Sequence, residues 1–411
     1  MSFLKKFQFV FVSVFIVAAA FVGGFYLGKG EKEVLVVNKK GEPIESGTVT
    51  IRPDQVKAYL GKDIDFDIFT TVWGMLKKQY VDQPVSETNL FYGALQGMVA
   101  ALDDPYSVFL EPQVSEAFSD SLKGRFEGIG AEIAIKHDVL TVVSPLDGSP
   151  AKKAGLKPRD LIAKIDGEST KDLSVNEAVN RIRGEGGTTV MLTIAREGVD
   201  ALFDVPIVRD TINVKSVSWE MKDNAIAYIQ IRSFNEDTST AFKAIQREVI
   251  SKNPKGIIFD LRNNPGGFLQ TSVDVSSAWI DKKVVVSERS VDGSTTYTAQ
   301  GTPLLTGIPT VILVNGGSAS ASEIVSGALQ DYKIAYIIGE QTFGKGSVQV
   351  LEDLPDGSSV KFTVAKWFTP NDRSINEEGI TPDEVIELTE ENFNNDEDPQ
   401  MDRALEYLNA L

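Results

Sequence analysis

PTVILVNGGSASASEIVSGALQDY, residues 309–332, contains the local pattern on which the fold depends. An apolar run typical of a buried strand leads into two glycines and alternating serines and alanines, and a helical pattern follows at SEIVSGALQDY. A serine at such a strand-to-helix turn lies beside helix N-terminal amides, which can stabilise an oxyanion. The same small residues are as typical of a tight helix–strand crossing with Ser318 or Ser322 as the N-cap, so the stretch alone leaves both interpretations open.

The flanking sequence alternates strand and helix in the same way. After Thr211 we expect helices at 238–251 and 269–280, and further strands at 226–231, 256–261 and 334–340. This alternation predicts a layered α/β core, with functional sites at glycine-rich strand ends. Residues 125–208 instead have the short strands of a small β-rich domain, and the helical pattern that precedes them stops at DDPYS.

The N-terminus has the features of a membrane signal. Phe9–Gly28 is uncharged, with Lys5 and Lys6 before it. At about 1.5 Å per residue, a helix of this length spans the hydrocarbon core of about 30 Å, whereas the apolar region of a cleaved signal peptide is usually shorter. We therefore favour an uncleaved anchor, and the lysines before it place the bulk of the chain outside the cytoplasm, in the periplasm or at the cell surface.

The composition limits the chemistry. The 411 residues carry a net charge of −17, which is unfavourable for nucleic-acid binding. The chain has no cysteine, which excludes disulfides, a cysteine nucleophile and thiolate metal sites. Its only histidine, His137, lies in a pattern typical of a strand–turn–strand and is more often a solvated turn residue than a catalyst. A serine nucleophile here would need a base other than histidine.

Lysine can act as that base when burial lowers its pKa. Lys345 in QTFGKGSVQ is flanked by glycines and follows an expected strand, whereas most other lysines lie in polar clusters. A surface loop lysine is an equally good interpretation of this segment by itself. In RNNPGG, residues 262–267, the paired glycines after a strand can turn backbone N–H groups into a cavity, although Asn-Pro-Gly is also a strong signal for an ordinary turn.

Taken together, these segments resemble the C-terminal processing peptidases, or tail-specific proteases, which are serine peptidases with a Ser/Lys dyad. The resemblance covers roughly residues 65–390. Its motifs are GALQGMVAALDDPYS, GSPAKKAGLKPRDLIAKIDG, DLRNNPGG, GSASASEIVSGALQD, GEQTFGKGSVQ and GITPD, in this order.

The resemblance implies the residue roles. Ser320 would be the nucleophile and Lys345 the base, with Gln349 orienting the lysine amine. The backbone amides of Gly266 and Ala321 would bind the oxyanion. The family motifs also include Glu323 and Asp331, which we interpret as structural support. The implied hydrolysis needs no metal or cofactor.

Residues 125–208 resemble a PDZ domain, which binds a peptide C-terminus by adding it to a sheet edge. Gly128 and Gly130 in FEGIG are expected to converge backbone amides on the carboxylate. An apolar terminal residue on the ligand would suit Ile129 and Leu161. The expected partners are therefore protein or peptide substrates with free, apolar C-termini, and by family analogy the helical part and the terminal helix could form a homodimer.

The expected fold is a mixed α/β (α+β) chain with a crotonase-like layered protease core and an inserted PDZ domain. The predicted parts are a membrane anchor or signal segment (1–30), a stalk with short strands (31–62), a helical part (63–124), the PDZ domain (125–208), the α/β protease core (211–390) and an acidic linker with a terminal helix (391–411). One rival function is a catalytically silent, membrane-tethered PDZ scaffold, which the presence of Ser320, Lys345 and Gln349 disfavours. A penicillin-binding type of Ser/Lys enzyme is disfavoured because Ser320 lacks the S-x-x-K spacing.

Overall fold

The computed structural model describes residues 64–146 and 148–411, and the chain divides into two compact units, Met1–Leu90 and Phe91–Leu411. In the first unit, α3 (Phe66–Gln79) begins after Asp65, whose side chain accepts a hydrogen bond from the backbone N–H of Asp67. No residue of α3 is buried, and its apolar side chains are exposed, namely Ile68, Phe69, Val72, Met75 and Leu76. Helix α4 (Glu87–Ala100) continues into the second unit.

The predicted membrane span, Phe9–Gly28, lies outside the described residues, as do the predicted stalk strands. Between residue 64 and the C-terminus, residue 147 excepted, no helix is long and apolar enough to cross a bilayer.

The second unit is built on a six-stranded sheet with the order β10-β11-β12-β15-β16-β19. Strand β10 is antiparallel to β11, and the remaining neighbours are parallel. Because parallel strands end at the same edge, the loops after β12, β15 and β16 meet there. The strands are Val217–Lys222, Ile226–Ile231, Gly256–Asp260, Thr310–Val314, Ala335–Gly339 and Glu384–Val385.

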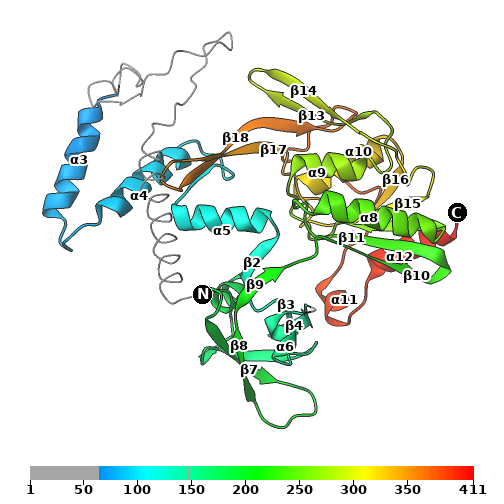
Figure 1. Cartoon of the computed structure of the whole chain (residues 1–411), viewed down its shortest axis with the longest axis horizontal. Helices are drawn as coiled ribbons and strands as arrows, with labels where there is room; N and C mark the ends of the chain where they lie inside the picture. The colour runs from blue at the N-terminus through cyan, green and yellow to red at the C-terminus, as the bar shows by residue number, and fades with distance from the viewer. Residues whose placement is uncertain (1–63, 147) are drawn as a thin grey trace, which may run out of the picture. The chain divides into compact units, whose positions relative to one another are not determined.

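Helices cover both faces of this sheet (Figure 1). Ile257 and Phe259 of β12 pack into the large core with α8 (Thr238–Ser251), α9 (Leu269–Ser276) and α10 (Ala321–Asp331). The intervening Ile258 packs on the other face, where α12 (Pro399–Asn409) contributes Ala404 and Leu408. This alternation explains why the central strands β12, β15 and β16 are mostly apolar at successive positions, as expected for strands buried on both faces.

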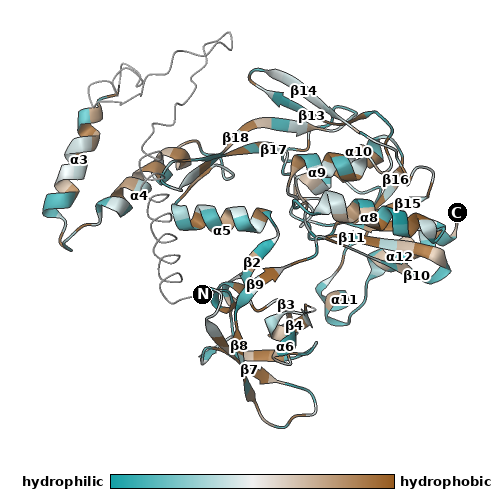
Figure 2. Cartoon of the chain, in the orientation of Figure 1, coloured by the Kyte–Doolittle hydropathy of each residue, from teal (hydrophilic) through white to brown (hydrophobic). Residues whose placement is uncertain are grey.

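A second sheet has the order β1-β18-β13-β14, with β17 also paired to β18. Its first strand, β1, follows the DDPYS turn, so the segment predicted to be helical also supplies a strand to a sheet of the predicted 211–390 core. Helix α5 (Pro112–Leu122) follows β1, and Figure 2 shows hydrophilic residues along much of it. The strands are Val108–Leu110, Val284–Ser290, Gly293–Thr298, Ser347–Asp353 and Ser359–Phe368 for β1, β13, β14, β17 and β18.

The small β domain has its own sheet, β3-β4-β5-β7-β8, with β6 paired to β5. Its separate core includes Ile129, Ile162 and Ile194. A two-stranded ribbon of β2 (Arg125–Gly128) and β9 (Asp210–Asn213) joins the start of the domain to its end, so the domain is an insertion. The other elements are β3 (Ala131–Lys136), β4 (Val139–Pro145), α6 (Pro150–Lys153), β5 (Leu161–Ile165), β6 (Glu168–Ser169), α7 (Val175–Ile182), β7 (Thr189–Ala195) and β8 (Phe203–Val208).

Most element predictions for the core are confirmed. Helix α8 has the predicted bounds, and the strands expected at 226–231 and 256–261 are β11 and β12. The helix expected over 269–280 is shorter, because α9 ends at Ser276 and the chain continues through single turns to Ile280. The acidic linker contains a short helix, α11 (Glu390–Asn394), before the terminal helix.

Candidate active site

The three serines of SASAS differ in what their hydroxyls do. Ser318 and Ser322 are fully buried, and their hydroxyls donate to the backbone carbonyls of Leu261 at 2.8 Å and Asn264 at 2.9 Å. Ser320 between them is only partly buried. The outer two therefore tie the turn to the loop after β12, and Ser320 is the serine whose side chain is accessible.

Ser320 has a strained backbone. Its φ of 54° and ψ of −111° are unusual for a residue with a Cβ, and it is the N-cap of α10. Such strain is typical of a serine held on a sharp turn between a strand and a helix. The turn directs Ser320 outwards and leaves the first amide of α10, Ala321 N–H, beside it.

A single buried carboxylate joins this turn to the lysine loop. Oε2 of Glu323 accepts hydrogen bonds from the backbone N–H groups of Ser320 at 2.7 Å and Lys345 at 2.9 Å. Its Oε1 accepts from the Thr342 hydroxyl and the Gly344 N–H, each at 2.6 Å. Burial raises the pKa of the Glu323 carboxyl, and these four donors act in the opposite direction. Glu323 therefore has the supporting role expected of it, and it holds both candidate residues.

Lys345 lies in the loop between β16 and β17 and is partly buried. Burial lowers the pKa of its ammonium group, the positive charge of Lys361 lowers it further, and Glu323 has the opposite effect. Its Nζ lies 5.6 Å from the centroid of the Tyr106 ring. A lysine in this environment is more readily neutral than a surface lysine, as a general base requires.

Gln349 lies on β17, near the start of the strand. Its Nε2 donates to the hydroxyls of Ser347 at 2.6 Å and Thr363 at 3.3 Å. Both amide hydrogens are thus used by hydroxyl groups. Its Oε1 receives no hydrogen bond from any residue that the structure describes, so this oxygen is available to an amine.

The structure brings Gly266 and Ala321 together but modifies the expected oxyanion site. A Cβ on Gly266 would lie 2.8 Å from Ser320 Cβ and 3.0 Å from Ala321 N, so these residues are in contact. However, Gly266 N–H already donates to Oδ1 of Asn264 at 2.9 Å. In this conformation the Gly266 amide is therefore occupied, and the role of the Gly266 and Ala321 amides in binding the oxyanion stays a prediction. The next amide, Gly267 N–H, donates to none of the described residues.

Asp331, the other motif carboxylate, lies at the far end of α10. Eleven residues along a helix correspond to about 16 Å, so Asp331 is remote from Ser320. It accepts hydrogen bonds from Arg373 at 2.5 Å and from Asn371 N–H at 2.8 Å. These contacts fix the loop after β18. His137 is exposed in the β3–β4 turn, and its backbone N–H donates to Oδ1 of Asn394 at 3.2 Å.

Two of the predicted peptide contacts in the small β domain are not brought together. Ile129 is 3% exposed in the domain core, which it shares with Ile162. Leu161 precedes Ile162 on β5, so it points to the opposite face and is 38% exposed. The two residues therefore lie on different faces of the domain, and their contact with an apolar peptide terminus stays a prediction.

The loop predicted to bind a carboxylate has suitable backbone geometry. Gly128 ends β2, and Gly130 has a φ of 69°, where a Cβ would lie 2.6 Å from Ser149 Cβ. No hydrogen bond to a described residue uses the N–H groups of Ile129 and Gly130. Edge strand β3 begins directly after them, so a peptide added to this edge would have its terminus near these amides.

The sequence-based reasoning missed Asp104, Tyr106, Thr363 and Asn264. In the sequence, DDPYS is a helix-stopping turn and part of a family motif, and neither gives Asp104 or Tyr106 a role. In the structure, the Thr363 hydroxyl donates to Asp104 and the Tyr106 ring lies near Lys345. The RNNPGG pattern gives Asn264 no role of its own, yet its side chain is fully buried and bridges Ile231 O and Gly266 N–H. An acidic residue within a helix-stopping turn was the available signal for Asp104. Asn264 had no such signal.

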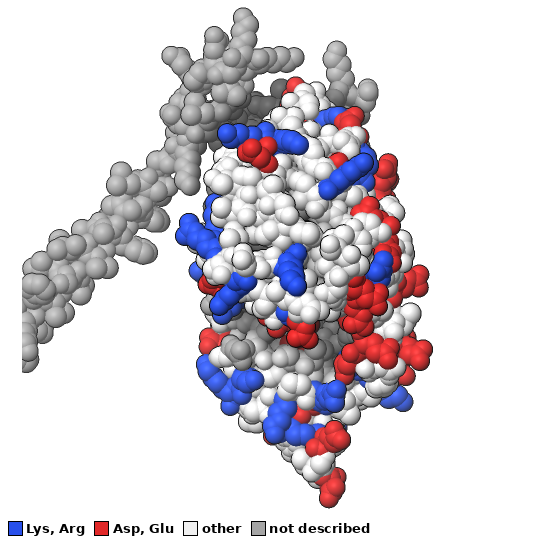
Figure 3. All heavy atoms as spheres, turned by 90° about the vertical axis from the view of Figure 1, so that its right-hand side faces the viewer, with Lys and Arg blue, Asp and Glu red and all other residues white. Residues whose placement is uncertain are grey.

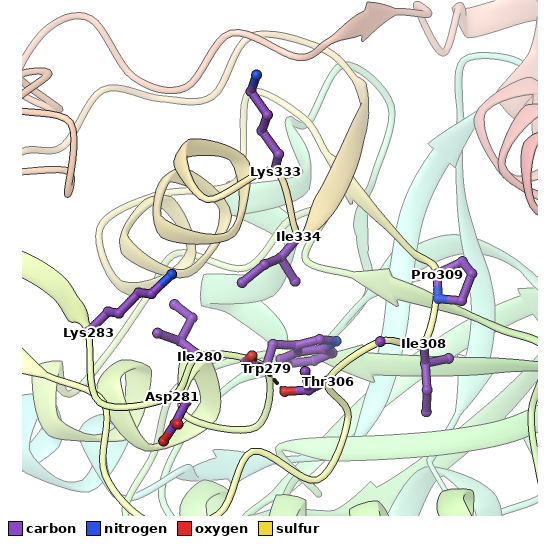
Figure 4. Close-up of a pocket in the computed structure, with 10 residues that line it drawn as sticks. Trp279, Ile280, Asp281, Lys283, Thr306, Ile308, Pro309, Lys333 and Ile334 are labelled. Carbon is purple, nitrogen blue, oxygen red and sulfur yellow. Dashed lines mark hydrogen bonds between the residues drawn. The ribbon is translucent and has the colours of Figure 1, made fainter.

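A cavity of about 460 Å³ lies away from these residues. It is lined by Trp279, Ile308 and Ile334, with Lys283 and Lys333 at its margin (Figure 4). Pro309 and Ile334 precede β15 and β16, whereas the Ser320 and Lys345 loops follow these strands. The cavity is therefore at the opposite end of the sheet.

Charge is unevenly distributed over the surface. Figure 3 shows acidic side chains gathered along one edge of the face that it presents, with lysines and arginines scattered between uncharged areas. This face has no continuous basic surface of the kind that binds nucleic acid.

Known families match most of the chain. Peptidase family S41 matches residues 225–386, a PDZ domain matches 141–196, and the activating protease CtpB N-terminal domain matches 23–114. The carboxy-terminal processing protease CtpA of Bacillus subtilis (strain 168) is 42% identical over 327 residues, covering 79% of this chain and 70% of that protein. The carboxy-terminal-processing protease of Bartonella bacilliformis is 41% identical, covering 78% and 74%.

A solved structure agrees with this relationship. The photosystem II D1 C-terminal processing protease is 31% identical, with a TM-score of 0.51 over 78% of this chain and 86% of that one. The matched segments include the Ser320 turn, the Lys345 loop and the small β domain. The chain therefore belongs to the carboxy-terminal processing proteases of peptidase family S41, and it is a serine-type peptidase with a PDZ domain.

Proposed function

We propose that the chain is an endopeptidase with Ser320 as its nucleophile and Lys345 as its general base. The observation that carries this assignment is the Glu323 carboxylate, which holds the backbone of both residues through one oxygen. The partial exposure of Ser320, compared with the buried Ser318 and Ser322, supports the choice of serine. The partly buried position of Lys345, with the positive charge of Lys361 nearby, supports the choice of base.

The proposed reaction forms an acyl-enzyme. Neutral Lys345 takes the hydroxyl proton of Ser320 as its Oγ attacks the scissile carbonyl carbon. The protonated lysine then donates to the leaving amine, and the C–N bond breaks. Water hydrolyses the resulting ester with Lys345 again as base. General-base assistance of this kind contributes about 10²–10⁴-fold to the rate.

The tetrahedral oxyanion would lie between the Ala321 N–H and the glycine turn. Ala321 is the first residue of α10, so the helix dipole adds to its hydrogen bond. In the conformation described, Gly267 N–H is the available partner. Gly266 N–H could join it only after Asn264 Oδ1 releases this amide.

Substrates are proposed to be proteins recognised through a free C-terminal tail. The Ile129 and Gly130 amides would bind the terminal carboxylate, and β3 would pair with the tail. An amidated substrate lacks the negative charge and should therefore be cleaved more slowly. The name of the Bacillus relative, a carboxy-terminal processing protease, is consistent with this substrate class.

We also propose that the chain is anchored in a membrane by Phe9–Gly28, with the protease outside the cytoplasm, where it meets extracytoplasmic proteins. The apolar sequence and the preceding lysines support this arrangement.

A homodimer is proposed from the exposed apolar side chains of α3. Carbonate extraction of membranes and sedimentation of the detergent-solubilised chain would test the two proposals; a carbonate-soluble chain or a monomer would contradict them.

The decisive experiment uses an unfolded protein with an apolar C-terminus as substrate. We expect cleavage by the wild-type chain, loss of cleavage in Ser320→Ala and in Lys345→Ala, and slower cleavage of the amidated substrate. Cleavage that persists in Ser320→Ala would exclude this nucleophile. If the wild-type chain does not cleave, labelling by a serine-reactive phosphonate separates a gated enzyme, which is labelled at Ser320, from a silent PDZ scaffold, which is not.

A further inference from the structure

A hydrogen-bonded network behind Gln349 includes a carboxylate from the DDPYS turn. Oδ2 of Asp104 accepts hydrogen bonds from the hydroxyls of Thr363 at 2.7 Å and Ser107 at 2.5 Å. Its Oδ1 accepts from the Tyr106 N–H at 3.1 Å. These hydrogen bonds hold the pKa of Asp104 below its ordinary value although partial burial raises it, so the carboxyl is ionised at neutral pH.

Because the Asp104 carboxyl is ionised, it determines which groups of this network donate and which accept. Asp104 can only accept, so the hydroxyl hydrogen of Thr363 must point toward it. The lone pairs of Thr363 Oγ1 then face the other way, toward Gln349. Only the Nε2 side of the Gln349 amide can donate to these lone pairs, and Nε2 is the atom found 3.3 Å away. The alternative amide orientation would place two acceptors, Thr363 Oγ1 and Gln349 Oε1, against each other.

The orientation of Gln349 bears on the catalytic amine. With both Nε2 hydrogens used by Ser347 and Thr363, the Oε1 of Gln349 is available to accept a hydrogen bond. The same turn that supplies Asp104 also places the Tyr106 ring 5.6 Å from Lys345 Nζ. The turn therefore contacts the lysine amine directly and reaches Gln349 through Thr363.

We propose that Asp104 is a positioning residue for the base, acting through the Thr363 hydroxyl to keep the carbonyl oxygen of Gln349 directed at Lys345. The assignment rests on the proposed Ser/Lys function. Asp104 touches neither substrate nor the reacting atoms; it determines which atom of Gln349 the lysine meets.

The test compares variants that change the hydrogen bonds leading from Asp104 through the Thr363 hydroxyl to Gln349. Thr363→Val removes the hydroxyl but keeps the shape of the side chain and the charge of Asp104. Thr363→Ser keeps the hydroxyl. In Asp104→Asn, the new NH2 group can donate to Thr363 Oγ1. The Thr363 hydroxyl hydrogen would then point toward Gln349 instead. Ser359→Ala is the control, because Ser359 is a fully buried hydroxyl on the same strand, bonded to Ser115 instead.

We expect Thr363→Val and Asp104→Asn to lower kcat by about 10- to 100-fold, the cost of a misplaced catalytic group, with little change in KM. Thr363→Ser should retain most of the rate, and Ser359→Ala should retain all of it. In a Gln349→Ala background, Asp104→Asn should cause no further loss, because the residue through which it acts is absent.

Two results would overturn the proposal. One is an equal loss from Asp104→Asn with and without Gln349, which would indicate an independent structural effect. The other is full kcat in Thr363→Val. Failure of the Ser/Lys function itself is distinguished by Ser320→Ala, since a chain that cleaves without Ser320 refutes the function whatever Asp104 does.

Discussion

Ser320 and Lys345 donate their backbone N–H groups to the same oxygen, Oε2 of Glu323, at 2.7 and 2.9 Å. The two residues are twenty-five positions apart and belong to different loops. Their spacing is therefore fixed through the backbone and is independent of any bond between their side chains. This arrangement leaves both side chains available for the proposed proton transfer, and the following predictions depend on it.

Replacing the shared carboxylate should separate the two residues. In Glu323→Gln, one acceptor oxygen becomes an NH2 group that cannot accept from the backbone N–H groups around it, so at least one hydrogen bond is lost. Each buried donor left without a partner costs about 1–3 kcal/mol, and we expect a lower free energy of unfolding and a loss of kcat. Urea unfolding and peptide cleavage would measure both. Ser272→Ala on α9 is the control for loss of a buried hydrogen bond away from the shared carboxylate. A kcat equal to wild type in Glu323→Gln would contradict the prediction.

The rate should depend on the charge of Lys345. Only the neutral amine can take a proton, so cleavage should rise with pH through the folded-state pKa of Lys345, which burial and Lys361 lower. Removing the neighbouring charge in Lys361→Gln should move this rise to higher pH. The exposed Lys366 on the same strand provides a matched control in Lys366→Gln. A pH–rate profile that does not move in Lys361→Gln would exclude Lys361 as the cause of the lowered pKa.

The partly buried Lys345 should also reduce the free energy of unfolding at neutral pH. Because its pKa is lower in the folded chain, the unfolded chain binds more protons between that pKa and the unfolded value of about 10.4, and the free energy of unfolding rises with pH over this window. Lys345→Met removes the charge that burial penalises. We therefore expect this variant to be inactive yet more stable than wild type at neutral pH in chemical denaturation. A less stable Lys345→Met chain would refute this account.

The glycine turn should not tolerate a side chain. In Gly266→Ala, the new Cβ would lie 2.8 Å from Ala319 O and from Ser320 Cβ, at a φ of 103°. The new Cβ would also press against the Ala321 amide, a proposed oxyanion donor. Displacing one such donor costs about 10²–10³-fold in kcat, and we expect at least this loss. Gly301→Ala is the control, since Gly301 also has a positive φ of 86° but no atom within 4 Å of its Cβ position. Kinetics at saturating substrate would decide, and similar kcat values for the two variants would contradict the steric argument.

Replacing either neighbouring serine should lower stability but should not prevent labelling of Ser320. Ser318→Ala and Ser322→Ala each remove a buried hydroxyl bonded to a backbone carbonyl, which should cost about 1–3 kcal/mol of stability. A serine-reactive phosphonate should still label both variants and should fail to label Ser320→Ala. Mass spectrometry of the labelled peptide locates the adduct. An adduct on Ser318 or Ser322 would contradict the assignment of Ser320 as the nucleophile.

Sequence patterns predicted the elements whose signals are local. The apolar run at Thr310–Val314 is flanked by turn residues, and α8 has a helical period of apolar residues, so β15 and α8 could be placed from neighbours alone. Family resemblance placed Ser320, Lys345 and Gln349. The structure alone reveals the carboxylate that joins the first two, because Thr342, Gly344 and Lys345 approach Glu323 from a different loop.

Long-range polar contacts could not be predicted in this way. Asp104 and Thr363 are separated by 259 positions, and neither residue type in its own segment indicates the other. Asn264 follows a strand in a sequence typical of a turn, yet its Nδ2 donates to Ile231 O, 33 positions earlier. Such contacts depend on how the strands are ordered, which hydrophobic periodicity does not specify.

The insertion of the small β domain between the DDPYS turn and the protease core has a consequence for biosynthesis. Ribosomes make the N-terminal part first, and domains generally fold as they emerge. The turn that carries Asp104 is complete long before Thr363 is translated, and Ser320, Lys345 and Gln349 also come late in the chain. The nascent chain thus lacks the complete set of candidate site residues until Gln349 has been synthesised, and the site can assemble only late in translation.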